Sequence, residues 1–154
     1  MSPQELSPAE ALKRLWIAQG IEEKLNSLII EARSMVESTR VAANLDKTQM
    51  NNLLGVALQT ESALVVANYV RYQVGRDNKA QTWRAGEFGE RLATYLEGLQ
   101  SEAAAIAHDA AGRAAGSLTP TDTDLAWIGL VRQFIGQLNR YFVYKRTSEG
   151  REEG

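Results

Sequence analysis

The sequence contains no cysteine and only one histidine, His108. Without cysteine, the chain can form no disulfide bond, no thiol nucleophile and no thiolate-ligated metal site. With His108 as the sole histidine, a zinc site would rest on carboxylates, which are a poor donor set for zinc. A serine nucleophile would have a single candidate base. The sequence therefore predicts no cofactor and no metal, and it favours a binding protein over an enzyme.

Long apolar runs and glycine-rich phosphate-binding loops are also missing. No apolar run reaches the roughly 18 residues that a membrane span requires. The N-terminal segment MSPQELSPAEALKRL lacks the basic and then apolar layout of a secretory signal. The hydrophobic fraction of 44% and the charged fraction of 23% are ordinary for a globular protein. We therefore expect a cytoplasmic protein without a membrane partner.

The apolar residues recur with the period of a helix. They follow three- and four-residue intervals, and no segment alternates convincingly at the two-residue period of a strand. Proline, which interrupts helices, occurs only three times. We expect an all-α protein, a single-domain bundle of five or six helices over residues 1–146, followed by a disordered acidic tail over residues 147–154.

Several residues predict where helices begin and end. Ser7 and Pro8 form the start of a capped helix, and Asp46 is expected to cap another. Gly20 is expected to lie at a helix boundary, and Gly75 is expected to be a left-handed C-cap. The predicted helices start near residues 8, 21, 46, 60 and 85, and a last one, capped by Thr121 or Asp122, runs to about residue 145; residues 76–84 are expected to form a loop.

The apolar side of each helix is expected to form the core. Leu58 and Leu64 are assigned to this buried side by their spacing. Tyr72 and Tyr144 instead lie beside basic residues in the sequence, where an aromatic ring can stack on a nucleotide. The last helix is expected to bury Trp127, Leu130, Val131, Phe134, Ile135, Leu138, Tyr141 and Phe142.

The formal net charge of −2 conceals an uneven distribution. Between Arg40 and Arg91 the basic residues outnumber the acidic ones, and residues 130–146 contain basic residues but no acidic residue. Among the charged residues of segment 92–129, acidic side chains outnumber the single basic one, Arg113. A mildly acidic protein of this kind can still present a basic surface to a partner.

The segment around His108 is similar to the active helix of histidine phosphotransfer domains. In that family, a lysine stands three residues after the histidine and a glycine stands four residues after it. Gly112 matches the glycine, whereas Ala111 replaces the lysine that would neutralise a phosphoryl group. A phosphotransfer domain that uses His108 is therefore an alternative, and a structural histidine in an alanine-rich helix is the favoured interpretation.

Three short elements along the chain have a recognisable pattern. The first is a capped helix start, LDKTQMNNLL, at residues 45–54. The second is YVRYQVGRD at residues 69–77, which contains a Tyr-x-x-Gly-Arg element. The third is the aromatic helix end QFIGQLNRYFVYKR at residues 133–146. Together they resemble the small subunit of type III CRISPR effector complexes, of the Csm-complex type. Asn51 and Tyr69 depart from the pattern, because the family often has basic residues at or near these positions.

The resemblance implies a helical, non-catalytic subunit that stacks in several copies beside other effector subunits. It would contact guide and target RNA through a basic face, while base pairing supplies the sequence specificity. Arg76 matches the family element directly. The full set of candidate RNA-binding residues is Arg40, Lys47, Arg71, Arg76, Lys79 and Arg84. A helical adaptor that binds only protein is a further alternative.

Overall fold

The computed structural model describes residues 6–150, and within them it contains seven α-helices, one 3-10 helix and no strand. The predicted all-helical bundle is confirmed, with a short additional helix, α3, that the sequence pattern did not indicate. The elements are α1 (Pro8–Glu22), α2 (Leu25–Thr39), α3 (Val41–Asn44), α4 (Lys47–Gln59), α5 (Ala63–Arg76), η1 (Ala85–Glu87), α6 (Phe88–Arg113) and α7 (Pro120–Ser148).

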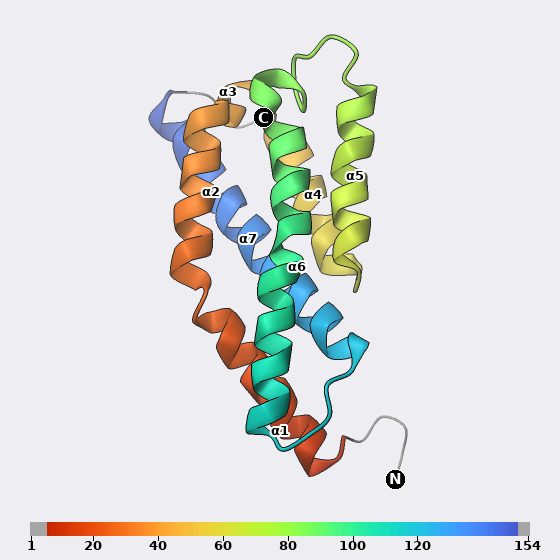
Figure 1. Cartoon of the computed structure of the whole chain (residues 1–154). Coiled ribbons are helices and arrows are strands. Elements are labelled where there is room, and N and C mark those ends of the chain that lie inside the picture. Colours follow the sequence, from red (N-terminus) through yellow and green to blue (C-terminus); the bar gives the residue numbers. More distant parts are fainter. Residues whose placement is uncertain (1–5, 151–154) are drawn as a thin grey trace.

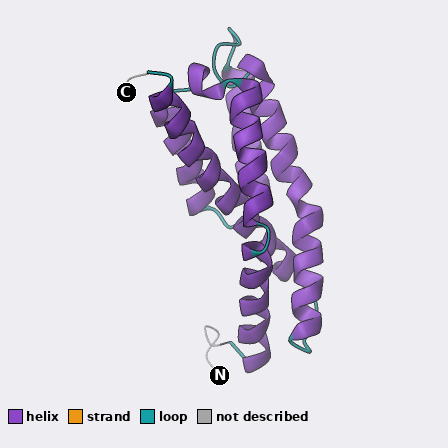
Figure 2. Cartoon of the chain, turned by 90° about the vertical axis from the view of Figure 1, so that its left-hand side faces the viewer, coloured by secondary structure: helices purple, strands orange, loops and turns teal. Residues whose placement is uncertain are grey.

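The helices form an elongated bundle organised around α6 and α7. In Figure 1, α1 and α2 follow one another along one side and together extend over the length of α6, while α5 packs against the upper half of α6 on the other side. Helix α7 crosses behind α6 and packs against α1, α2, α3, α4 and α5 as well. The side view in Figure 2 shows the same long, narrow shape. Helix α7 is therefore the central element of the fold.

The core follows from the apolar face of α7. Phe134 and Phe142 are completely buried, and Trp127 donates a hydrogen bond from Nε1 to the backbone oxygen of Leu96 at 2.9 Å. Burial of each large apolar side chain stabilises the fold by roughly 1.5–3 kcal/mol. The expected core residues of the last helix are buried, except Tyr141, which is partly exposed.

The predicted helix starts are largely confirmed. The Ser7 side chain accepts a hydrogen bond from the backbone N–H of Glu10, and Pro8 is the first residue of α1. Asp46 and Gln49 form a complete capping box at the start of α4. The last helix begins earlier than expected. Its N-cap is Thr119, and Asp122 is the third helical residue, whose carboxylate accepts from the Thr119 backbone N–H at 2.8 Å.

Two glycines that were expected to end helices lie within them. Gly20 is inside α1, where a Cβ atom would lie 2.7 Å from Ile106, so the glycine permits close packing of α1 on α6. Gly75 is inside α5, and the helix ends at Arg76, followed by the C-cap residue Asp77, which has a negative φ. The prediction of a left-handed cap at Gly75 was therefore wrong.

Two leucines that were assigned to the core lie on the surface. Leu58 is 60% exposed and Leu64 is 53% exposed. Both lie near the turn between α4 and α5, where the buried positions are taken by smaller residues, Ala57 and Ala63. Other residues assigned to these faces, Leu53 and Ala57 on α4 and Ala67 and Val70 on α5, are buried as expected, so Leu58 and Leu64 lie at the edge of the predicted faces.

The ends of the chain differ slightly from expectation. Helix α7 continues through Ser148, two residues into the predicted disordered tail, and residues 151–154 of that tail lie outside the described residues. Within residues 6–150, no helix is both long enough and apolar enough to cross a bilayer.

Candidate nucleic-acid interface

The loop between α5 and η1 is ordered by a single carboxylate, that of Asp77. Its oxygens accept hydrogen bonds from the backbone N–H groups of Gln81, Thr82 and Arg84 at 3.1, 3.0 and 2.9 Å. Burial alone would raise the pKa of Asp77, but these hydrogen bonds lower it below its ordinary value. The loop therefore holds a fixed shape, with the side chains of Lys79 and Arg84 exposed.

A buried tryptophan fastens the same loop to the core. Trp83 is 2% exposed, and its ring lies 6.4 Å from that of Tyr69 and 5.9 Å from that of Phe88, measured between centroids. The residue after it, Arg84, is held at the surface by this anchor. Its guanidinium also donates to the Asp77 backbone oxygen at 3.4 Å.

Arg76 ends α5 and is exposed. Its guanidinium lies 5.4 Å from the ring centroid of Tyr72, one helical turn earlier. Such a cation–π contact leaves the N–H groups at the edge of the guanidinium available to a further acceptor. The Tyr-x-x-Gly-Arg element of the sequence thus has a local structural role as well as a candidate binding role.

Arg40 is brought to this loop by a tight contact between α2 and η1. A Cβ atom on Gly86 would lie 2.1 Å from the backbone oxygen of Thr39, the residue before Arg40. Arg40 itself adopts a left-handed conformation, with φ of 59°, between α2 and α3. Since Arg84 is two residues before Gly86, the chain near residue 40 and the chain near residue 84 meet at one end of the bundle (Figure 1).

We define the basic end by Arg40, Arg76, Lys79 and Arg84. None of these four forms an ion pair with a carboxylate among residues 6–150. Acidic groups lie there too: the exposed Glu87, the loop carboxylate Asp77, and Glu37 and Glu149, which line a cavity together with Arg40. Lys47 begins α4, close after α3, which packs on η1, and it has contacts of its own within the bundle.

Arg71 has a different environment from the other candidates. Its Nη2 lies 3.0 Å from a carboxylate oxygen of Glu97 and 3.9 Å from one of Glu90, both on α6. The side chain is 36% exposed, and its Nη1 is buried without a hydrogen-bond partner. Arg71 therefore joins α5 to α6, and its charge is already balanced by acidic groups of the protein.

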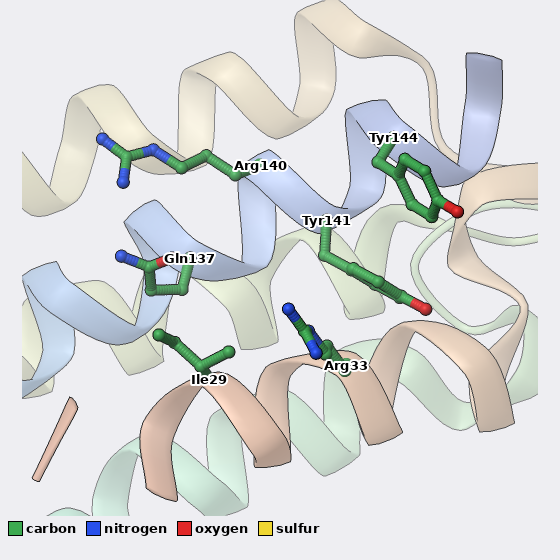
Figure 3. A pocket seen from close by; sticks show the side chains of 6 residues that line it. All are labelled: Ile29, Arg33, Gln137, Arg140, Tyr141 and Tyr144. Carbon is green, nitrogen blue, oxygen red and sulfur yellow. The ribbon is translucent and has the colours of Figure 1, made fainter. Parts of the chain in front are cut away.

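A second basic surface, the α2–α7 groove, lies between those two helices. It encloses about 460 Å³ and is lined by Ile29 and Arg33 of α2 and by Gln137, Arg140, Tyr141 and Tyr144 of α7 (Figure 3). Helical spacing places the four α7 residues on one face of that helix. Arg33 lies over the Tyr141 ring at 5.6 Å, and the Tyr141 and Tyr144 centroids are 5.5 Å apart.

The sequence pattern only partly indicates this groove. It contains the basic, acid-free segment 130–146 and the aromatic Tyr144, but nothing in it connects them to Arg33. Arg33 lies on a different helix, more than a hundred residues earlier in the chain, so no local motif connects the two. The sequence does indicate one wall of the groove, because the spacing of Arg140, Tyr141 and Tyr144 places them on one face of the last helix.

Two other basic residues of the same segment have structural roles. Arg132 donates to the backbone oxygens of Ala57 and Thr60 at 3.0 and 2.8 Å, at the end of α4. Arg146 donates to the backbone oxygen of Leu45 at 2.8 Å. Both guanidinium groups satisfy carbonyl groups that the ends of short helices leave without partners.

His108 is exposed on α6 and forms no hydrogen bond or ion pair within residues 6–150. The cation in its helical neighbourhood, Arg113, is paired with Asp109 at 2.8 Å and stacked on Trp16 at 4.7 Å. Ala111, at the position of the phosphotransfer lysine, is buried. In the part of the chain that the structure describes, no three acidic or histidine side chains are grouped as metal ligands.

Comparisons of the chain with models of protein families, with curated proteins and with solved structures give no match.

Proposed function

We propose that this protein is a non-catalytic small subunit of a type III CRISPR effector complex, and that it contacts the backbone of guide and target RNA through the basic end. The observation that carries the proposal is the close contact of Thr39 with Gly86, which brings Arg40 to the end of the bundle where α5 and the following loop present Arg76, Lys79 and Arg84. None of these four residues forms an ion pair with a carboxylate among residues 6–150. Guanidinium and ammonium groups neutralise phosphates without reading sequence, which suits a complex in which base pairing supplies specificity.

The sequence resemblance supports the same function independently of charge. Its first element coincides with the capping box of Asp46 and Gln49, and its second supplies Arg76 and the ordering carboxylate Asp77. The second element thus shapes the loop that presents most of the basic end. The exposed leucines Leu15 and Leu58 add apolar surface of the kind that a subunit uses to contact other subunits or further copies of itself.

The test is a double charge reversal, Arg76→Glu with Arg84→Glu, in a complex co-expressed with its partner subunits. The variant complex is expected to assemble, retain wild-type helicity and release target RNA at lower salt than the wild-type complex. The matched control is Arg14→Glu with Lys24→Glu, which makes the same change of charge on α1 and at the junction of α1 and α2, outside the basic end. Each lost phosphate contact reduces the salt dependence of log affinity by about one unit.

The alternatives give different results in the same experiment. If the double reversal holds RNA as wild type does, partner subunits still co-purify and the isolated chain binds no RNA at low salt, the protein is an adaptor that binds only protein. If isolated protein accepts an acid-labile phosphoryl group that His108→Gln abolishes, the phosphotransfer alternative replaces the proposal. Co-purification of both RNA and partner subunits, sensitive to the reversal, supports the proposal.

A further inference from the structure

The α2–α7 groove combines two kinds of group that a nucleotide requires. Arg33 and Arg140 come from different helices, are exposed, and form no ion pair with any carboxylate among residues 6–150. The ring of Tyr144 is 60% exposed. Free guanidinium groups bind phosphate oxygens, and an exposed aromatic ring stacks on a base.

The arrangement along the groove separates these groups. Figure 3 shows Tyr141 and Tyr144 at one end, Gln137 and Arg140 at the other, and Ile29 and Arg33 on the opposing wall. In Figure 3 the Arg33 guanidinium lies beside the Tyr141 ring, whereas the Arg140 guanidinium is directed away from both tyrosines, so the two arginines would meet different phosphates of a bound strand. The amide of Gln137 offers both a hydrogen-bond donor and an acceptor to a polar ligand.

The acidic group nearest to the aromatic end is already engaged. Glu37, one turn after Arg33 on α2, accepts a hydrogen bond from the Tyr141 hydroxyl at 2.5 Å and pairs with Lys145 at 3.2 Å. These contacts fix the Tyr141 ring, and Lys145 is shared with a second carboxylate, that of Glu149, at 3.7 Å. The positive charge of the groove therefore comes from Arg33 and Arg140, and its edge at Glu37 also carries acidic groups.

The groove also adjoins the basic end. Glu37 and Lys145 line a second, smaller cavity together with Arg40. A strand that extends from the groove toward Arg40 would pass this cavity, which Glu149 also lines. This continuity favours a nucleotide within a strand over a free nucleotide.

We infer that the α2–α7 groove binds an unpaired nucleotide of a single-stranded RNA, with its base on Tyr144 and its phosphates on Arg33 and Arg140. The inference rests on the proposed function, since it extends the path of RNA from the basic end. It assigns to the bundle a second contact, which recognises an unpaired base rather than a duplex backbone.

The affinity test uses a labelled oligouridine of about ten nucleotides, a length within the range that single-stranded binding sites cover. Its binding to the purified full chain is measured by fluorescence anisotropy at low salt. Tyr144→Ala is expected to weaken binding about tenfold, in line with the loss of one stacked base. Tyr144→Phe keeps the ring and is expected to bind as wild type does. Arg140→Gln is expected to weaken binding and to reduce the slope of log affinity against log salt concentration by about one. Arg14→Gln changes an exposed arginine on α1 and is the control, which is expected to bind as wild type does.

A second readout locates the base directly. Oligouridine that contains 4-thiouridine is expected to cross-link to the tryptic peptides 133–140 and 141–145. Cross-links confined to peptides elsewhere in the chain would overturn the assignment even if the affinities changed as expected.

The outcomes separate this inference from the proposed function. If Tyr144→Ala and Arg140→Gln bind oligouridine as tightly as wild type, while Arg76→Glu with Arg84→Glu releases RNA, the groove assignment fails and the proposed function stands. If the groove variants lose binding and the double reversal has no effect, RNA does not bind at the basic end, and the assignment of the nucleotide to the groove is supported. Uridine monophosphate that displaces the oligonucleotide at equal nucleotide concentration would identify a free nucleotide as the ligand and overturn the assignment to a strand.

Discussion

The ammonium group of Lys13 lies 2.9 Å from the carboxylate of Asp122, and the two side chains are 1% and 4% exposed. Lys13 also pairs with Glu10 at 2.8 Å and donates to the backbone oxygen of Ser117 at 3.0 Å. This cluster joins the start of α1 to the start of α7 and to the loop before it. A buried ion pair of this kind tolerates the loss of one partner poorly, because the other charge then remains without compensation.

The first prediction concerns the pH dependence of this cluster. Hydrogen bonds to Glu10 and then to Asp122 raise the pKa of Lys13 above 10.5. Burial would raise the pKa of Asp122, but the hydrogen bonds from Lys13 and Thr119 lower it below 3.8. The stabilisation by Asp122 is therefore full above pH 3.8 and is lost as the pH falls through its folded pKa, whereas that by Lys13 is full below pH 10.5 and is lost as the pH rises through its own.

Thermal unfolding of Asp122→Asn and of wild type checks this prediction. The difference in Tm is expected to be constant near neutral pH and to narrow as the pH falls below 3.8, the ordinary value for aspartate. Lys13→Met is expected to lower Tm more than Lys24→Met, since Lys24 is only partly buried. If the difference in Tm between Asp122→Asn and wild type stays constant well below pH 3.8, the ionised Asp122 carboxylate does not stabilise the fold.

The second prediction concerns the capping box of α4. Asp46→Ala removes the acceptor for the Gln49 backbone N–H, a bond of 2.7 Å, and is expected to destabilise the fold by about 1 kcal/mol. Urea unfolding provides the measurement. Asn51→Ala, an exposed position within the same helix, is the control and is expected to change stability by less than about 0.5 kcal/mol. Equal losses in the two variants would contradict the capping role.

The third prediction concerns Gly86, which has a φ of +62° and contacts the Thr39 backbone oxygen. Gly86→Ala is expected to cost roughly 1–3 kcal/mol, because the backbone conformation disfavours a side chain and the Cβ would displace η1 from α2. Gly112→Ala is the control. It lies within α6 with no atom near its Cβ position, and it is expected to stabilise the helix by roughly 0.5–1 kcal/mol. If both substitutions stabilise the protein, η1 is not tightly held against α2.

The fourth prediction separates Arg71 from the basic end. Because Arg71 is paired with Glu97, Arg71→Met is expected to leave the affinity for RNA within about twofold of wild type and to reduce stability by less than about 1 kcal/mol. Arg76→Met, at an exposed and unpaired position, is expected to weaken RNA binding. The salt dependence of RNA binding by the two variants checks this, and a larger effect of Arg71→Met would place the RNA path along α5 and α6 instead.

The sequence was sufficient for the fold class and for the helix starts that depend on local side chains. Ser7 and Asp46 act through residues three positions away, so their patterns could be recognised directly. Gly20 and Gly75 could not be interpreted in the same way, because a glycine may end a helix or admit a neighbour. The presence of Ile106 opposite Gly20 decides between these roles, and it is a tertiary contact.

The candidate site likewise has features that local sequence predicts and features that depend on the packing of helices. Arg76 and Lys79 are close in sequence, and their common loop could be predicted from the polar segment 76–84. The pairing of Arg71 with Glu97 depends on the packing of α5 on α6, and the juxtaposition of Arg33 and Arg140 depends on the packing of α2 on α7. No periodicity within one helix determines which charges of another helix will face it.

The central position of α7 has a consequence for biosynthesis. Of the described helices, α7 is translated last, yet it contacts each of the other six. Until α7 leaves the ribosome, the apolar faces of α2, α4 and α6 lack the surface that covers them. The nascent chain is therefore expected to remain open and accessible to chaperones through most of its synthesis, and to close in one late step.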